Sequence, residues 1–181
     1  MLPMAPGIPK MTRPSVHRDC GTAARAAPRE PLEQVTLAAE LCAQRGARLT
    51  TIRRLILELL WRRNEPMGAY ELIEDWKRAT GRTVGPPTVY RALEFLIAQG
   101  LVSKLESRNA FVPCAHPEHH HICVFFICVA CGASTELEDP EIEARLSRDA
   151  ATLGFRIGRR IVEVQGTCAV CAGTTAMPPR G

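Results

Sequence analysis

Two pairs of cysteines have the spacing of metal-binding knuckles: Cys128 with Cys131, and Cys168 with Cys171. A C-x-x-C turn aims both thiolates at one point, and two such turns supply four sulfur ligands for a tetrahedral zinc ion. The stretch between the pairs is longer than in a simple zinc ribbon, so a folded unit must be inserted there. A redox C-x-x-C is the alternative, but neither pair has a thioredoxin-like βαβ context. The sequence therefore predicts a structural zinc site at these four cysteines.

A second group of metal-ligating residues precedes the first cysteine pair. Residues 114–121 read Cys-Ala-His-Pro-Glu-His-His-His and contain four of the five histidines of the chain. Glu136, which follows the first cysteine pair, adds a carboxylate. Mixed thiolate, imidazole and carboxylate ligands suit zinc and disfavour magnesium or calcium. We therefore expect a second metal site at Cys114, the histidine tract and Glu136, with a chance surface tract of histidines as the alternative.

An enzyme would use the same residues differently. His116-Pro-Glu118 followed by the Cys128 pair resembles the H-x-E…P-C-x-x-C signature of zinc nucleobase deaminases. In that signature a proline precedes the first cysteine and the pair opens a helix, whereas Ile127 stands here at the end of a strand-like run. The second cysteine pair would also have no role. We expect no catalytic site, and a zinc nucleobase deaminase is a remote alternative.

The start of one predicted helix carries side chains that suit contacts to DNA. Residues 85–88, Gly-Pro-Pro-Thr, predict its first turn, since proline fits that position. Thr88, Tyr90 and Arg91 are expected on the solvent side. In helix-turn-helix proteins this turn enters the major groove, where Arg can pair with guanine and Tyr can contact thymine or phosphate. Tyr70 is a further candidate, and the alternative is an ordinary solvated helix start.

The elements that position these residues form two groups. Apolar residues at helical and alternating spacing, together with Gly and Pro stops, predict a winged helix-turn-helix pattern followed by a small β-β-α-β unit, an α+β fold. The expected elements are helices at 32–45, from Thr50 or Thr51 to Pro66, at 69–79 and at 86–99, strands at 101–106 and 110–112, then strands at 122–129 and 134–137, a helix at 140–153 and a strand at 155–164.

These elements divide the chain into a winged-helix domain at 32–113 and a metal-binding domain at 114–173. Residues 1–31 are rich in Pro, Ala, Gly and Arg without periodicity and are expected to be a disordered tail, as are residues 174–181.

Composition is that of an ordinary globular protein, with 46% hydrophobic and 23% charged residues and a net charge of +4. The basic excess lies in the N-terminal two-thirds, because residues 108–181 carry seven Lys or Arg against eight acids. No apolar run approaches the roughly 18 residues needed to cross a bilayer, and the start has no secretory h-region. We therefore expect a cytoplasmic protein with no membrane contact, whose reduced cysteines bind metal rather than form disulfides.

Several motifs in order resemble the ferric uptake regulator family, and most closely its zinc uptake regulator branch. They are P-P-T-V-Y-R-A-L-E-F-L from Pro86, G-L-V-S-K-L-E-S-R-N-A-F-V-P-C ending at Cys114, F-F-I-C-V-A-C-G from Phe125 and G-T-C-A-V-C from Gly166, within residues 33–173. The resemblance implies a homodimeric winged-helix repressor that binds a pseudo-palindromic operator in double-stranded DNA. It would respond to zinc and control genes of zinc uptake and homeostasis.

The resemblance also assigns ligands. It implies a structural zinc at the two cysteine pairs and a regulatory zinc at Cys114, His121 and Glu136. Iron-sensing relatives have histidines leading directly into the first cysteine pair, and peroxide-sensing relatives have a histidine in the N-terminal domain. This chain has neither, so a regulator that responds to iron or peroxide is the alternative within the family.

The chain departs from the zinc branch at one ligand. The first wing strand of that branch usually offers a histidine, and here the position is Ser103. His119 is our preferred substitute, since in an extended segment it shares a face with His121. His116 is less favoured because Pro117 stiffens the chain beside it. A water molecule as fourth ligand, or a weakened site, is the other alternative.

Overall fold

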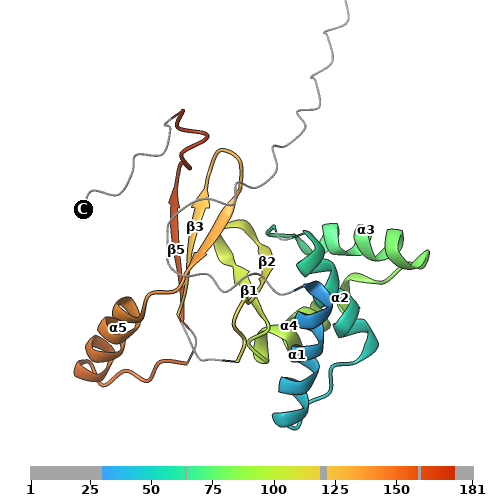
Figure 1. Cartoon of the computed structure of the whole chain (residues 1–181), viewed down its shortest axis with the longest axis horizontal. Helices are drawn as coiled ribbons and strands as arrows, with labels where there is room; N and C mark the ends of the chain where they lie inside the picture. The colour runs from blue at the N-terminus through green and yellow to red at the C-terminus, as the bar shows by residue number, and fades with distance from the viewer. Residues whose placement is uncertain (1–29, 64, 119–121, 159, 174–181) are drawn as a thin grey trace, which may run out of the picture.

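The computed structural model describes residues 30–63, 65–118, 122–158 and 160–173. The expected tails lie almost wholly outside these residues, as do the candidate ligands His119 and His121. Four helices and a two-stranded wing are followed by a three-stranded sheet and one more helix (Figure 1). The elements are α1 (Pro31–Gln44), α2 (Thr51–Arg63), α3 (Ala69–Thr80), α4 (Pro86–Ala98), β1 (Val102–Leu105), η1 (Glu106–Arg108), β2 (Ala110–Pro113), β3 (Cys123–Cys128), β4 (Ser134–Leu137), α5 (Pro140–Thr152) and β5 (Ile161–Gly166).

The four N-terminal helices enclose one apolar core. Each contributes side chains that are almost fully buried, and the wing adds Leu101, Val102 and Phe111 to the same cluster. Burial of one large aliphatic side chain stabilises the fold by about 1.5–3 kcal/mol. The buried helical residues at its centre are Val35, Ile56, Leu60, Leu72, Val89, Leu93 and Leu96. This unit therefore has a sufficient hydrophobic core of its own.

The wing, β1 paired with β2, has two faces with different partners. The backbones of Met67 and Phe111 exchange hydrogen bonds of 3.0 and 2.8 Å, which fix the wing to the helical unit. Ser103 lies opposite Val112 in the antiparallel register. Leu105 and Val112 pack with residues of β3 in a second apolar cluster. The wing therefore joins the helical unit to the C-terminal sheet.

The C-terminal sheet has the order β4-β3-β5, with β4 antiparallel and β5 parallel to β3. The strand expected at 155–164 begins later, at Ile161, so its predicted start was wrong. β5 pairs with β3 from Cys123 onward, and the strand exists only where it has that partner. Phe155, ahead of the paired segment, is 68% exposed despite its apolar side chain.

The last helix, α5, contrasts with the others. Asp139 caps it by accepting hydrogen bonds from the backbone N–H groups of Glu141 and Ile142, and Pro140 occupies its first turn. It has no buried residue, and Leu146 is 40% exposed. Figure 1 shows it beside the lower end of the sheet rather than across its face.

None of the helices in the described ranges is both long enough and apolar enough to span a membrane.

Candidate metal centres and DNA interface

The two cysteine pairs meet at one end of the C-terminal sheet. Cys128 is the last residue of β3, and Cys168 follows the end of β5, its parallel neighbour. The backbone N–H of Val129 donates to the carbonyl of Gly166 at 2.9 Å, which holds the two strand ends together. The sulfurs of Cys128, Cys131, Cys168 and Cys171 all lie within 4.8 Å of one another. We call these residues the four-cysteine site.

The spacing of these sulfurs fits a tetrahedral zinc ion. Ligand sulfurs about 2.3 Å from such an ion lie about 3.8 Å from each other. The Sγ atoms of Cys131 and Cys168 are 3.8 Å apart. Gly132, which has φ +80°, lets the first knuckle turn directly after its second cysteine. The donor set and its geometry therefore suit zinc.

Thiolate formation is already favoured at one of these sulfurs. The backbone N–H of Cys168 donates to the Cys128 sulfur at 3.3 Å, and this bond, with the N–H of Cys131, lowers the pKa of Cys128 to about 6. The pKa of Cys171 is raised to about 12, first by its hydrogen bonds with Cys168 and Cys131. The lowered pKa favours a thiolate at Cys128, whereas the raised pKa favours a protonated thiol at Cys171. A metal ion bound by all four sulfurs would displace the remaining thiol protons.

Two of the residues expected in a second metal site, Cys114 and Glu136, lie where the wing meets the sheet, whereas His119 and His121 fall outside the described residues. Cys114 directly follows β2 and is buried, and Glu136 of β4 is paired with Phe125 of β3. The charge of Glu136 acts on the Cys114 thiol, which places the two side chains in the same region. His116 is 3.9 Å from Glu118, measured from Nδ1 to Oε1.

Sequence reasoning missed Cys123, the first residue of β3. Its thiol is buried at the wing and interacts with that of Cys114. A hydrogen bond between these two thiols is the main reason why the pKa of Cys114 lies above its usual range. Burial and the charge of Glu136 raise this pKa further. The Ser103 hydroxyl donates to the Cys123 sulfur at 3.7 Å. Only the alternation of side-chain direction along a strand could have indicated that Cys123 shares a face with Phe125 and Ile127.

A second contact joins the tip of the wing to the sheet. The carboxylate of Glu163, on β5, accepts hydrogen bonds from the backbone N–H groups of Glu106 at 2.7 Å and Ser107 at 3.2 Å. Partial burial raises the pKa of Glu163, but hydrogen bonds from the Ser107 hydroxyl and these N–H groups outweigh it and lower the pKa overall. The Arg108 guanidinium donates to the carbonyl of Gly132 in the first cysteine knuckle. The wing tip is therefore anchored beside the four-cysteine site.

The candidate DNA-contacting residues gather around the first turns of α3 and α4. Arg91 is exposed, and Tyr70 is 70% exposed. Thr88 is partly exposed, as expected, whereas Tyr90 is only partly on the solvent side because its ring packs against the core. The Arg91 side chain of α4 therefore points to solvent, whereas the Tyr90 side chain partly packs α4 against the other helices.

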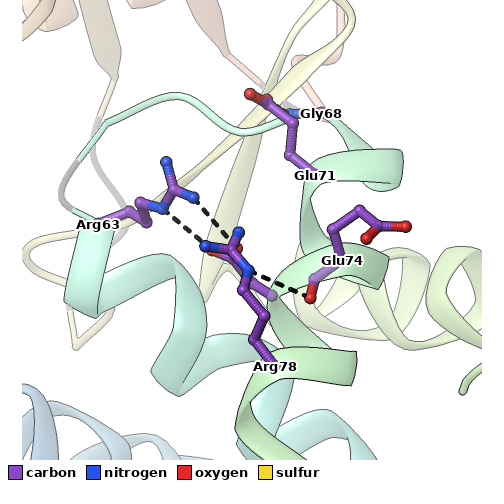
Figure 2. A network of polar contacts seen from close by, with 6 residues as sticks. Arg63, Gly68, Glu71, Glu74 and Arg78 are labelled. Carbon is purple, nitrogen blue, oxygen red and sulfur yellow. Dashed lines mark hydrogen bonds and ion pairs between the residues drawn. The ribbon is translucent and has the colours of Figure 1, made fainter. Parts of the chain in front are cut away.

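Arg63 and Arg78, which are labelled in Figure 2, fix α3 against the end of α2 through their contacts with Asp75. The buried Asp75 carboxylate accepts two hydrogen bonds from Arg63, at 3.0 and 3.1 Å, and a further one from Arg78. Figure 2 also shows Glu71, whose carboxylate accepts from the backbone N–H of Gly68 at 2.8 Å and so caps α3. These contacts position the helix that carries Tyr70.

Comparisons with known proteins agree with this architecture. The family model described as the ferric uptake regulator family matches residues 44–165. The zinc uptake regulation protein of Escherichia coli strain K12 is 38% identical over 145 residues, which cover 80% of this chain and 84% of that protein. A solved zinc uptake regulator in complex with zinc and DNA superposes with a TM-score of 0.72 at 36% identity, covering 80% of this chain and 97% of its own. The crystal structure of holo XcZur is 45% identical, with a TM-score of 0.67, and covers 78% of this chain and 98% of its own.

Proposed function

The chain belongs to the ferric uptake regulator family, and we propose that it is a cytoplasmic, zinc-responsive repressor that binds double-stranded DNA as a homodimer. Its targets are genes of zinc uptake and homeostasis. Similarity to a zinc uptake regulator bound to zinc and DNA supports both ligands. A regulator that responds to iron or peroxide is the second candidate. The thiolate, imidazole and carboxylate ligands expected at the second site favour zinc over iron as the bound metal.

The four-cysteine site has a structural role in this proposal. When bound, zinc would cross-link the ends of β3 and β5 through four thiolates. Cys128 and Cys131 hold one side and Cys168 and Cys171 the other, so the chain between them is closed into a loop. Because Cys128 ends a strand instead of opening a helix, the pair lacks the placement that a nucleobase deaminase needs.

The second site has a regulatory role. Cys114 belongs to the end of the wing, whereas Glu136 and the preceding histidine tract belong to the C-terminal part of the chain. A ligand set drawn from both fixes the wing, and with it α4, relative to the sheet. This is a population shift toward one arrangement of the DNA-binding units. The observation that carries the proposal is the similarity to a zinc uptake regulator complexed with zinc and DNA, and the placement of Cys114 at the end of β2 and Glu136 on β4 supports it.

DNA recognition follows from the first turns of two helices. Arg91 is placed to contact a base edge in the major groove, with Thr88, Tyr90 and Tyr70 contributing further base or phosphate contacts. A two-fold dimer presents two such helices, which calls for a pseudo-palindromic operator. The uncovered α5 and the half-exposed Phe126 and Val164 on β3 and β5 support dimerisation through the C-terminal unit.

The proposal is tested by a mobility shift on DNA selected from a random library. The protein, with only its four-cysteine site filled, is titrated with zinc, iron(II) or manganese(II). We expect retardation at the lowest concentration with zinc and a palindromic selected sequence. Equal retardation without added metal, or a preference for iron(II), would reject zinc as the effector, and no retardation at all would reject the repressor.

A further inference from the structure

Ser103 and Cys123 form a small polar contact within the otherwise apolar interface between the wing and the C-terminal sheet. Leu105, Val112, Phe125 and Ile127 form one buried apolar cluster there, together with the Cys123 side chain. Ser103 lies in the same contact and is 6% exposed. Among the described residues it is one of three buried polar side chains, with Gln34 and Asp75. A buried hydroxyl is stable when its hydrogen bond is made, so its partner is informative.

That partner is a sulfur from the other unit. The Ser103 hydroxyl donates to Cys123 Sγ at 3.7 Å, although the two residues are on different sheets. A neutral thiol accepts a hydrogen bond weakly, whereas a thiolate accepts one strongly. The donor on Ser103 therefore suits Cys123 in its ionised, metal-binding form.

The strand register puts two candidate ligands, Cys123 and Glu136, on one side of the sheet. Cys123 and Phe125 share a face of β3 because side chains alternate along a strand. Glu136 is the direct partner of Phe125 in the antiparallel register, so its side chain emerges on that same face. Cys114, which follows β2, is buried, and its thiol forms a hydrogen bond with that of Cys123. Cys123 therefore lies beside Cys114, on the face of the sheet that also carries Glu136.

We propose that Cys123 is a ligand of the regulatory metal, together with Cys114 and Glu136, and that Ser103 donates a hydrogen bond to its sulfur. The inference rests on the proposed function and names the group that completes its regulatory site. It replaces His119 as our preferred fourth ligand.

The position of Ser103 explains why a cysteine fits here. A ligand carried by residue 103 would project toward the place that the Cys123 sulfur now occupies, 3.7 Å from the serine oxygen. The chain therefore takes its ligand from β3 and keeps the wing attached through the serine hydroxyl. Two thiolates shift the site toward zinc and away from manganese and iron(II), and each thiol gives its proton to solvent when the metal binds.

Cobalt(II) alone, added to protein whose four-cysteine site is already filled with zinc, counts the thiolates at this second site. Each thiolate bound to cobalt contributes a near-ultraviolet charge-transfer band. We expect Cys123→Ser to lose about half of that intensity and to weaken cobalt binding by about 100-fold, beyond the effect of most outer hydrogen-bond partners. Ser103→Ala keeps the intensity and weakens binding about tenfold. Cys42→Ala, at a buried thiol of the helical core, is the matched control and changes neither.

A double variant guards against a folding defect. Ser103→His combined with Cys123→Ala moves a ligand to the wing, so it should recover most of the affinity while the band stays at half intensity. The inference is overturned if Cys123→Ser keeps full intensity, or if His119→Ala removes the affinity that Cys123→Ser leaves intact. Zinc-dependent retardation of DNA is measured on the same samples. If zinc still causes retardation of DNA while Cys123→Ser leaves the cobalt band unchanged, the inference fails and the proposed function stands. If the cobalt band reports two thiolates but zinc causes no retardation of DNA, the inference stands and the proposed function fails.

Discussion

The helical unit and the C-terminal unit are stabilised by different means. Residues of α1 to α4 and one wing face share a continuous buried core, whereas α5 buries nothing and β4 and β5 contain no fully buried residue. Cys123, Phe125 and Ile127 of β3 form a small cluster with the wing. We therefore expect the first unit to fold by apolar burial and the second to depend on metal ligation and a partner subunit.

Removal of a ligand from the four-cysteine site should have the largest effect on this contrast. Structural zinc contributes about 10–16 kcal/mol in small zinc domains, so Cys131→Ser or Cys168→Ser should unfold or monomerise the C-terminal unit. The α-helical circular dichroism of α1 to α4 should persist, with a separate thermal transition. Cys42→Ala is the control, with full zinc content. A Cys131→Ser protein that remains a folded dimer with full zinc content would show that the four cysteines are not the structural site.

A charge on the uncovered sheet face should come next. Phe126 is 47% exposed and lies beside Val164 in the register of β3 and β5. Phe126→Glu should weaken dimerisation by about 2 kcal/mol or more if this face is a central part of the interface. Sedimentation velocity across a dilution series measures the shift. Leu32→Glu, at a 69% exposed residue of α1, is the control and should leave the dimer unchanged; equal behaviour of the two variants would place the interface elsewhere.

A substitution on the DNA side should leave the metal side untouched. Arg91→Ala should cost about 1–3 kcal/mol on the selected operator and relax the preference at one base pair per half-site, because a forked contact to guanine is lost. Fluorescence anisotropy with specific and random DNA separates the two effects. Zinc content and dimer mass should equal those of the unaltered protein. A similar loss on both DNAs would make Arg91 a phosphate contact.

The smallest effect is expected at the wing tip. The lowered pKa of Glu163 means that its ionised form is favoured in the folded state, so its stabilisation is complete above its ordinary pKa of about 4.3. That stabilisation is lost as pH falls through the lower, folded-state value. Its size is at most about 1 kcal/mol because the side chain is only partly buried and solvent screens its charge. Amide chemical shifts of Glu106 and Ser107 should titrate with Glu163 and stop doing so in Glu163→Gln; shifts that titrate equally in the variant would refute the contact.

Sequence patterns predicted the elements better than the contacts between them. Apolar spacing and Pro or Gly stops placed α2 and α4 within a few residues, because a helix carries its own periodicity. The C-x-x-C spacing predicted that the two cysteine pairs share one metal site, because each pair is a local turn that presents two thiolates to one ion. Cys123 was not among the predicted ligands because its place beside Ser103, 20 positions earlier, depends on the contact between the wing and the sheet. The start of β5 was misplaced because its length is set by β3 rather than by its own residues.

Amide hydrogen exchange at three metal loadings tests the central claim most directly: one metal folds the C-terminal unit and a second joins it to the wing. Zinc at the four-cysteine site should protect β3, β5 and the segment around Cys168. Zinc at the second site should then protect β1, β2 and residues 114–118, with the protection of α2 and α4 unchanged at every step. If the first zinc protects α2 and α4 as strongly as β3, or if the second leaves the wing as exchangeable as before, the division of labour between the two sites is contradicted.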